Sequence, residues 1–323
     1  MQNLGIDIGR GCLKAYSEYE GKELKCLFTS VVANATTKEK DLEVYFNEEN
    51  ESKSVYFSAE ILGQDSFKHI YCGEIAEKEG YTPTQNVSDS KVTQEAKKLL
   101  IGALSKIAIA PEVNIMLGVP NRDYRKSVLN DVVNTYKGKE IYIENNFTKE
   151  VKKIKIVNIS IAKESDSALL YEIATNNPNN DKDFAMVNIG YRTMEIAFYN
   201  NDLSYNNRLS ISEPLGNSKI LEQVKDELSS KKIYKNLYEI DNSKRYDDIK
   251  ERAYEEFSHG LNQLVEGKIE NLSEVNLYIC GGISGKLKVR KEFKKVNDPQ
   301  MITAKGLWLK ATQTFKSEVD ING

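Results

Sequence analysis

The chain begins with apolar residues at alternating positions that give way to glycines. Leu4, Ile6 and Ile8 occupy every second position, and Gly9 and Gly11 follow with one residue between them. Alternation with a period of two predicts a β-strand with one buried face. Two glycines this close together predict a tight turn into a second strand, because glycine adopts backbone conformations that other residues avoid. The first residues therefore predict a β-hairpin.

Two charged residues give this hairpin a candidate chemistry. Asp7 lies within the first strand, and Lys14 lies just beyond the turn. Backbone amides of a glycine turn can close on phosphate oxygens, an aspartate can hold a metal ion through water, and a lysine adds positive charge. An ordinary hairpin has the same strand-turn-strand pattern. The hairpin alone leaves two interpretations open, a structural turn and a phosphate-binding loop.

Periodicity along the rest of the chain predicts strands that alternate with amphipathic helices. We expect helices at residues 93–109, 123–134, 165–174, 217–229, 247–267, 286–295 and 303–314. We expect strands at residues 23–30, 54–59, 113–119, 139–144, 154–160, 184–190, 194–199, 203–212 and 274–280. Apart from one strand, residues 31–90 are irregular and polar, and the acidic cluster at 47–51 is typical of a solvated turn.

The opening pattern occurs a second time in the chain. The strand at 184–190 ends in a glycine turn and a returning strand follows, so residues 4–16 and 184–199 are two versions of one unit. Two related lobes that each donate a hairpin to one cleft explain this repeat economically. A later strand runs into Gly281 and Gly282. This pair is interpreted either as a plain turn or as a place where a flat group such as a nucleoside approaches closely.

The composition is that of a globular protein. Of 323 residues, 40% are hydrophobic and 29% are charged, and the net charge of -3 provides no overall positive field to recruit DNA. Lysine runs at 149–155 and 286–295 alternate with apolar residues, which is typical of an exposed face. No run of about 18 apolar residues predicts a membrane span, and the first residues lack a secretion signal. We therefore expect a cytoplasmic protein that binds neither DNA directly nor a membrane.

Cysteine and histidine usage argues against a metal cluster. The four cysteines are widely separated and form no CxxC pair, and the chain has only two histidines. A zinc site is therefore not expected. Reduced, unpaired thiols agree with a cytoplasmic protein.

Three other residues have a structural interpretation when they are taken alone. Glu164 lies where a helix is expected to begin, and the helix dipole favours negative charge there. Lys225 and Asp226 lie on the outer face of the helix at 217–229, which is normally solvated. The order of these segments along the chain changes that interpretation.

The chain resembles the actin-like ATPase superfamily, which also includes sugar kinases and heat-shock chaperones, in the order of its segments. That order is the first hairpin, Glu164 at a helix start, the second hairpin, the helix with Lys225 and Asp226, and the strand that runs into Gly281 and Gly282. The resemblance implies an α/β fold of two related lobes, each a mixed β-sheet flanked by helices, with the nucleotide in the interdomain cleft. It covers nearly the whole chain, although each motif is short. The motifs are Asp7-x-Gly9-x-Gly11-x-x-Lys14 for the first phosphate loop, Asn188-Ile189-Gly190-Tyr191-Arg192-Thr193-x-Glu195 for the second, Gly281-Gly282 for adenosine and Ala304-Lys305-Gly306 for the second interdomain connection.

Within the superfamily, the chain is most similar to the ParM-like proteins of the bacterial plasmid-segregation branch. The resemblance implies a domain I at residues 1–162 plus 301–323, with a small subdomain at about 31–90. It implies a domain II at residues 163–300, with a small subdomain at about 217–255. This second subdomain is shortened, because its insertion is brief, so the strand number and twist of a filament stay open.

The resemblance also assigns roles to individual residues. Glu164 and Asn188 take the catalytic positions, with Glu164 orienting the attacking water, and Asp7 holds Mg²⁺ through water. The implied cofactors are ATP, or GTP, and Mg²⁺. The residues implied in nucleotide binding are Asp7, Gly9, Arg10, Gly11, Cys12, Lys14, Gly190, Tyr191, Arg192, Thr193, Gly216, Lys225, Asp226, Gly281, Gly282, Ile283 and Lys305.

Both phosphate loops depart from the family pattern. In the second loop, Asn188 replaces the usual aspartate, while Tyr191 and Arg192 replace small residues. In the first loop, Arg10 stands where a small residue is common. An asparagine lacks the charge that supports Mg²⁺, and two arginines partly substitute for that charge. We hypothesise that nucleotide binds well while hydrolysis is slow or depends less on Mg²⁺.

By resemblance, the protein polymerises into filaments and hydrolyses nucleotide to drive plasmid DNA segregation. Its partners are further copies of itself and an adaptor protein bound to a centromere-like plasmid site. Two alternatives stay open, a small sugar- or acetate-type kinase on the same fold and a non-segregating cytoskeletal filament protein. Kinases of this superfamily are usually larger, and residues 315–323 are too short and polar for the membrane-targeting tail of a cell-division protein.

Overall fold

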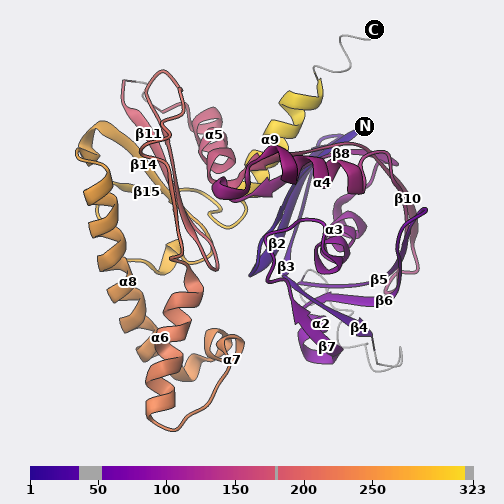
Figure 1. The fold of residues 1–323 in the computed structure, drawn as a ribbon, viewed down its shortest axis with the longest axis horizontal. Helices are drawn as coiled ribbons and strands as arrows, with labels where there is room; N and C mark the ends of the chain where they lie inside the picture. The colour runs from indigo at the N-terminus through magenta and orange to yellow at the C-terminus, as the bar shows by residue number, and fades with distance from the viewer. Residues whose placement is uncertain (36–52, 179–180, 317–323) are drawn as a thin grey trace. The chain divides into compact units, whose positions relative to one another are not determined.

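The computed structural model describes residues 1–35, 53–178 and 181–316. The acidic cluster at 47–51, expected to form a solvated turn, lies outside these residues. The chain divides into two compact units (Figure 1). Unit 1 comprises Met1–Ser167 and Thr303–Gly323, and unit 2 comprises Ala168–Ile302.

Unit 1 is built on a ten-stranded sheet in the order β3-β2-β1-β8-β10-β9-β5-β6-β4-β7. The strands are β1 (Gln2–Ile8), β2 (Cys12–Tyr19), β3 (Lys22–Thr29), β4 (Val31–Ala35), β5 (Ser54–Ile61), β6 (Ser66–Gly73), β7 (Gly80–Gln85), β8 (Glu112–Val119), β9 (Glu140–Asn145) and β10 (Val151–Lys163). The helices are α2 (Glu74–Glu79), α3 (Gln94–Ile107), the 3-10 turn η2 (Asn121–Asp123), α4 (Lys126–Tyr136), the start of α5 (Glu164–Asn176), and α9 (Ile302–Lys316).

Helix α3 forms the centre of unit 1. Figure 1 shows it surrounded by the curved sheet, and its apolar stripe includes the buried Leu99, Leu100 and Leu104. The helix begins where predicted, because the side chain of Thr93 accepts a hydrogen bond from the Ala96 amide at 3.2 Å. The alternating apolar residues of β1 pack into the same core. Successive residues of a strand point to opposite faces, so Asn3, Gly5 and Asp7 lie on the other face of β1.

The opposite face of the sheet carries an asparagine ladder and α9. Asn3, Asn114 and Asn158 lie side by side on β1, β8 and β10. The Asn114 amide donates to Asn3 at 2.9 Å, and the Asn158 amide donates to Asn114 at 3.1 Å. Gly5 makes room for α9, because a Cβ there would lie 2.2 Å from the amide nitrogen of Trp308. The sequence of β1 is therefore constrained by packing on both faces.

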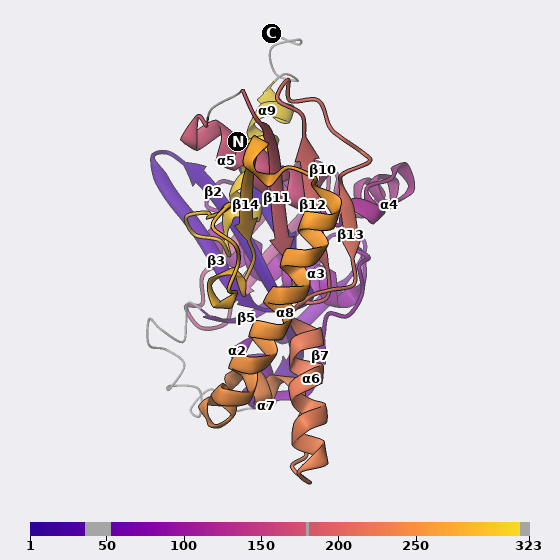
Figure 2. The same ribbon diagram turned by 90° about the vertical axis from the view of Figure 1, so that its left-hand side faces the viewer.

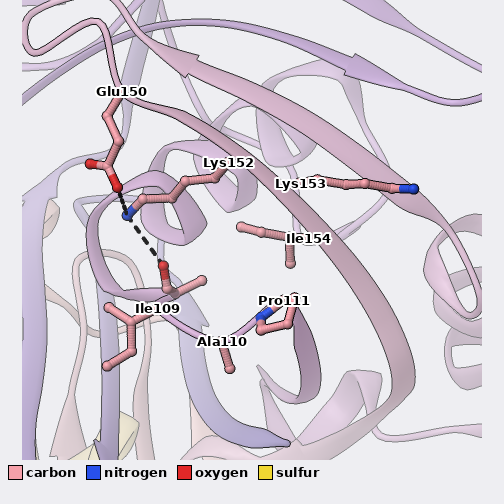
Figure 3. Close-up of a pocket in the computed structure, with 8 residues that line it drawn as sticks. Ile109, Ala110, Pro111, Glu150, Lys152, Lys153 and Ile154 are labelled. Carbon is pink, nitrogen blue, oxygen red and sulfur yellow. Dashed lines mark hydrogen bonds and ion pairs between the residues drawn. The ribbon is translucent and has the colours of Figure 1, made fainter.

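A shallow pocket lies where α3 ends and β8 begins, at the end of β8 opposite to Val119. Figure 3 shows Lys152 reaching across it from β10. The Lys152 ammonium donates to the carbonyl oxygens of Ser105 at 3.0 Å and Ala108 at 3.2 Å, and it lies 3.8 Å from Glu150. A lysine at this place satisfies the last carbonyls of α3 and complements its dipole. The pocket therefore has a structural explanation.

The expectation that residues 31–90 are mostly irregular is wrong for the part that the structure describes. Strands β4 to β7 and helix α2 lie there, and Tyr56, Tyr71 and Ile75 contribute to a small separate core. Strand β6 pairs with β5 on one side and β4 on the other. Its partner β5 precedes it directly in the chain, whereas β4 lies about thirty residues earlier, so this strand depends on its sheet neighbours rather than on its own alternation.

Unit 2 is built on a five-stranded sheet in the order β13-β12-β11-β14-β15. Its strands are β11 (Asp183–Ile189), β12 (Met194–Tyr199), β13 (Ile211–Glu213), β14 (Val275–Cys280) and β15 (Phe293–Lys295). Its helices are the rest of α5, α6 (Asn217–Ser230), α7 (Leu237–Asn242), η3 (Lys244–Tyr246), α8 (Asp247–Lys268), η4 (Leu272–Glu274) and η5 (Ser284–Lys286). None of the helices described in either unit is long and apolar enough to cross a membrane.

The predicted repeat of the hairpin has a structural counterpart. Strand β11 pairs antiparallel with β12 and parallel with β14. Strand β1 likewise pairs antiparallel with β2 and parallel with β8. The two hairpins therefore occupy equivalent places in their sheets.

Helices cover both faces of the sheet of unit 2. Ala185, Val187 and Ile189 of β11 pack with α6 and α8, while Phe184 and Met186 pack in a second core with α5. Figure 2 shows α8 running across the first face with α6 beside it. Successive residues of β11 alternate between the two cores, as the pleat of a strand requires.

The expectation of a strand at 203–212 is wrong for most of these residues. Only β13, at Ile211–Glu213, is a strand there. Leu203 has a φ of 64°, in the left-handed region that turns favour and strands exclude. A turn therefore separates β12 from β13.

The basic helix expected at 286–295 is also wrong. These residues are all described, and they contain the end of η5 and the strand β15, which pairs in parallel with β14. Leu287 and Phe293 are buried in the core of unit 2. Their packing holds the segment extended, so tertiary contacts override the helical pattern of the lysines.

Candidate functional site

Asp7 and Lys14 face each other across the hairpin of β1 and β2. They are register partners, and the Lys14 ammonium lies 2.8 Å from Oδ2 of Asp7. The Asp7 side chain is only 3% exposed. Because Ile6 and Ile8 point into the core around α3, the pleat turns Asp7 to the opposite face of the sheet. The two charges therefore lie together at the end of the hairpin.

The Lys14 ammonium keeps its charge in this position. Burial lowers its pKa, but attraction to Asp7, a hydrogen bond to Asp7 and attraction to Glu164 outweigh burial. The pKa of Lys14 is raised above its ordinary value as a result. The hairpin thus carries a fixed positive charge beside its glycine turn.

The second carboxylate oxygen of Asp7 is open. Oδ1 is buried and accepts no hydrogen bond within the described part of the chain. A buried oxygen without a partner is costly, so it points to a ligand. The described residues contain no group of three or more His, Cys, Asp or Glu that could hold a metal ion. Asp7 therefore fits Mg²⁺ that keeps several waters and takes its remaining ligands from phosphate.

Ser30 holds the turn between the two strands. Its hydroxyl donates to the carbonyl of Gly9 at 2.6 Å, and its amide donates to the carbonyl of Gly11 at 2.9 Å. A Cβ at Gly9 would lie 2.7 Å from the carbonyl oxygen of Cys12, so this position requires glycine. The sequence pattern does not identify Ser30. With two carbonyls already engaged, the loop is suited to an anion.

Arg10, between the two glycines, is bound by an acid. Its guanidinium forms an ion pair with Asp89, which lies between β7 and α3. The same carboxylate oxygen accepts a hydrogen bond from Arg122 of η2 at 2.7 Å. Arg10 was expected to bind phosphate, and neither Asp89 nor Arg122 is apparent as a site residue from the sequence.

Glu164 lies close to the Asp7–Lys14 pair. It is the first residue of α5, directly after β10, and its charge contributes to the raised pKa of Lys14. Gly118 on the neighbouring β8 leaves space for it, because a Cβ there would lie 3.0 Å from Cγ of Glu164. The carboxylate is therefore placed at the carboxyl ends of parallel strands, where sites form in open α/β sheets.

A buried lysine connects Glu164 to the hairpin. Lys91 is 4% exposed, and its ammonium donates to the carbonyl of Ile8 at 2.9 Å. The same nitrogen lies 3.8 Å from Oε1 of Glu164. The hydroxyl of Tyr136 donates to the Lys91 carbonyl at 2.6 Å and holds its backbone. The sequence pattern does not identify Lys91, which lies two residues before Thr93, the cap of α3.

Lys305 was expected among the nucleotide ligands. Its ammonium lies 5.5 Å from the ring centroid of Tyr16 and 3.9 Å from the carboxylate of Glu23. Tyr16 lies two residues after Lys14 on β2, on the same face of the sheet, and its ring packs edge-on against Trp308 of α9. These contacts give Lys305 a packing role on the sheet of unit 1.

The hairpin of unit 2 has the same outline and different chemistry. Asn188 is the register partner of Glu195, so an acid stands where Lys14 stands in unit 1. The amide of Gly190 donates to the carbonyl of Thr193 at 2.8 Å and closes the turn. These two register positions therefore hold an amide and a carboxylate in place of the carboxylate and ammonium of the first hairpin.

The amino terminus of α6 packs against this turn. The amide of Asn217 donates to the carbonyl of Gly190 at 3.1 Å, and that of Ser218 donates to the carbonyl of Tyr191 at 2.7 Å. Gly216 precedes the helix, and a Cβ there would lie 2.5 Å from the carbonyl oxygen of Tyr191. Gly216 is therefore required for the helix to approach the loop.

Side chains of the second half differ in their exposure. The ring of Tyr191 packs against the core of unit 2, so a contact with phosphate would come from its backbone. Arg192 is exposed, as are Lys225 and Asp226 on α6. These three charged side chains are accessible to a ligand.

Gly281 follows β14 in close contact with β11. Its φ is 105°, and a Cβ there would lie 2.1 Å from the carbonyl oxygen of Ile189. Gly282 is exposed, whereas Ile283 is buried in the core. The first glycine of the pair is required by packing, and the second leaves an accessible backbone.

Comparison with known proteins identifies the family. Residues 5–165 match the family model of the N-terminal domain of actin-like proteins. This stretch contains the first hairpin and Glu164. The chain is an actin-like protein. None of the curated proteins matches its sequence.

Solved structures share the fold of this actin-like protein. Ta0583, an archaeal actin homolog, has a TM-score of 0.78 at 16% identity, with 97% of this chain and 100% of that chain covered. ParM in a 15-stranded filament from Clostridium botulinum has a TM-score of 0.78 at 18% identity, over 97% and 99% of the chains. Bacillus thuringiensis ParM with ATP has a TM-score of 0.64 at 18% identity, over 97% and 99%. The predicted actin-like α/β fold and the resemblance to ParM-like actin homologues are confirmed.

Proposed function

We propose that this actin-like protein binds ATP, or GTP, with Mg²⁺ and hydrolyses it, and that it polymerises into filaments. The filaments drive plasmid DNA segregation in the cytoplasm through an adaptor protein bound to a centromere-like site. The observation that carries the proposal is the buried Asp7–Lys14 pair beside a glycine turn, in which Oδ1 of Asp7 has no partner among the described residues. A cation, an open carboxylate oxygen and a glycine turn are the parts that a metal–phosphate group requires.

Each side chain of the first half has a role in this proposal. Lys14 contacts phosphate, and the backbone amides of the glycine turn close on phosphate oxygens. Asp7 would hold Mg²⁺ through water, and the bound ion would neutralise part of the phosphate charge. Glu164 orients the attacking water and accepts its proton, while Lys91 holds Glu164 in place.

Groups of unit 2 are proposed to bind nucleotide as well. The turn at 190–193 binds phosphate through its backbone, and Arg192 adds a charge that is exposed in the structure. Asn188 replaces an acid, which reduces the support for Mg²⁺ and slows hydrolysis. Lys225, Asp226 and the accessible backbone of Gly282 bind the nucleoside.

Nucleotide binding and polymerisation are supported by what has been solved of proteins that share the fold. Ta0583 has been solved in complex with ADP, and a Bacillus thuringiensis ParM with ATP. ParM from Clostridium botulinum and Alp12 have been solved as filaments. Their fold is that of the present chain over nearly its whole length, which favours nucleotide-dependent self-assembly over the transfer of phosphate to a small molecule.

Light scattering and phosphate release on addition of ATP or GTP test the proposal. We expect scattering to rise with a triphosphate and electron microscopy to show filaments. Glu164→Gln should slow phosphate release by about a hundredfold while nucleotide binding is kept, because general-base catalysis contributes about that factor. Phosphate transfer to a sugar or to acetate without a rise in scattering would instead identify a kinase. Filaments that form without any co-sedimenting plasmid complex, in an extract that carries the plasmid and its adaptor, would favour a non-segregating cytoskeletal protein.

A further inference from the structure

One carboxylate oxygen binds two arginines beside the first glycine turn. Oδ2 of Asp89 forms an ion pair with Arg10 of the turn and lies 2.7 Å from a guanidinium nitrogen of Arg122. The side chains of Arg10, Asp89 and Arg122 are 17%, 29% and 49% exposed. The cluster is therefore partly shielded from water, and its charges interact more strongly than those of a surface pair.

The cluster neutralises the arginine of the loop within the protein. Arg10 offers a guanidinium that could bind phosphate through two parallel N–H groups, but one of its terminal nitrogens is engaged by Asp89. Its Nε is buried and has no hydrogen-bond partner among the residues that the structure describes. The guanidinium therefore has donors to spare, while its charge is already compensated.

Arg122 reduces the cost of separating Arg10 from Asp89. If Arg10 turned to another anion, Asp89 would keep Arg122 as a cationic partner. Without Arg122, the same movement would leave a partly buried carboxylate unpaired, which costs free energy. Arg122 is also 3.6 Å from Asp123 of its own turn, which fixes it beside the cluster.

We propose that Asp89 and Arg122 set the strength of phosphate binding by controlling Arg10. The phosphates of a bound nucleotide displace Asp89 from Arg10, and Asp89 is then retained by Arg122. Asp89 opposes nucleotide binding, Arg122 favours it, and both are positioning residues that act through Arg10. The inference rests on the proposed nucleotide binding and adds two residues to it.

Isothermal titration of the full chain with ATP tests this control. Asp89→Asn should tighten ATP binding by about fivefold, the worth of a partly exposed ion pair, and Arg122→Gln should weaken it by about the same factor. In the Asp89→Asn background, Arg122→Gln should have no further effect. In an Arg10→Gln background, Asp89→Asn should no longer tighten binding, whereas a general field effect of the removed charge would persist.

The dependence of the Asp89→Asn effect on the number of phosphates in the ligand distinguishes this mechanism from a purely structural role of Asp89. The effect of Asp89→Asn should decrease from ATP to ADP to AMP and vanish for adenosine, and it should shrink at high salt. Arg125→Gln is a matched control, because Arg125 lies 3.9 Å from Asp123 and belongs to the same segment. It should leave ATP affinity unchanged.

Three results would overturn the inference. They are weaker ATP binding by the Asp89→Asn variant, equal effects on ATP and adenosine, and a persistent gain in the Arg10→Gln background. If the wild-type chain binds neither ATP nor GTP, the proposed function itself is wrong, and the inference falls with it. The wild-type titration therefore distinguishes the two failures.

Discussion

The ammonium nitrogen of Lys91 lies 3.8 Å from Oε1 of Glu164. The same ammonium donates to the carbonyl of Ile8, at the end of the strand that carries Asp7. One buried cation thus connects Glu164, the proposed general base, to the proposed phosphate loop. Because a charge-assisted contact is worth about 1.5–3 kcal/mol, we expect Lys91→Met to slow phosphate release about tenfold to a hundredfold.

The Lys91→Met variant should keep most of its affinity for ATP, and Lys91→Arg should restore part of the rate. Lys97→Met is a matched control on α3, where Lys97 pairs with Asp65 at 2.6 Å. Single-turnover phosphate release, with circular dichroism to verify folding, measures the effect. Equal losses in the two methionine variants would contradict a specific role for Lys91.

Asn188 tests whether the second hairpin contributes to Mg²⁺-dependent hydrolysis. Asn188→Asp restores the charge that the family pattern carries there, so we expect faster phosphate release that EDTA abolishes more completely. The new carboxylate would face Glu195 across the hairpin, and like charges in register repel. Glu195→Gln in the same chain should therefore enhance the gain. Fast and strictly Mg²⁺-dependent turnover of the wild type would contradict the slow-hydrolysis hypothesis.

The two glycines after β14 should respond differently to alanine. A Cβ at Gly281 would lie 2.1 Å from the backbone oxygen of Ile189, and the φ of 105° disfavours any side chain. We expect Gly281→Ala to lower the free energy of unfolding by about 2–4 kcal/mol. At Gly282 the nearest atom is 3.7 Å away, on the flexible side chain of Gln300. Urea denaturation should find Gly282→Ala nearly as stable as the wild type, and similar losses in both would refute this packing argument.

A buried thiol makes the stability of unit 1 depend on alkaline pH. Burial raises the pKa of Cys26 to about 12, and attraction to Lys106 opposes this only in part. An unfolded cysteine ionises near ~8.5, so this group contributes its full stability below that pH. Above it, the contribution falls by about 1.4 kcal/mol per pH unit, until the folded thiol ionises as well. Urea denaturation at pH 7.5 and 9.5 should show a smaller loss for Cys26→Ala than for the wild type, and equal losses would exclude Cys26 as a cause.

Local patterns account for the elements that the sequence predicts well. The hairpin at the start of the chain follows from period-two alternation and a glycine turn, and both are properties of adjacent residues. Helix α3 follows from a cap at Thr93 and an apolar stripe, and it begins where that cap predicts. The second hairpin is recognisable because it repeats the same local signals.

The positions of charge partners are not local and could not be predicted in this way. Lys91 lies in a polar stretch, and only the fold brings it to Ile8 and Glu164. Asp89 meets Arg10 and Arg122 because their loops converge on one part of unit 1. A sequence shows which residues are charged, but it does not show which group neutralises each charge. The neutralising partner depends on the order of the strands in the sheet.

The spacing of apolar residues by itself determined the two hairpins, the central helix and the face of β1 on which Asp7 lies. Those features depend on the period of the backbone, which each short segment carries within it. The tertiary structure alone decided that residues 286–295 are not helical and that β4 to β7 extend the sheet, because partners from distant segments determine both. It also decided the environment of Arg10, whose charge is compensated by an acid from another loop.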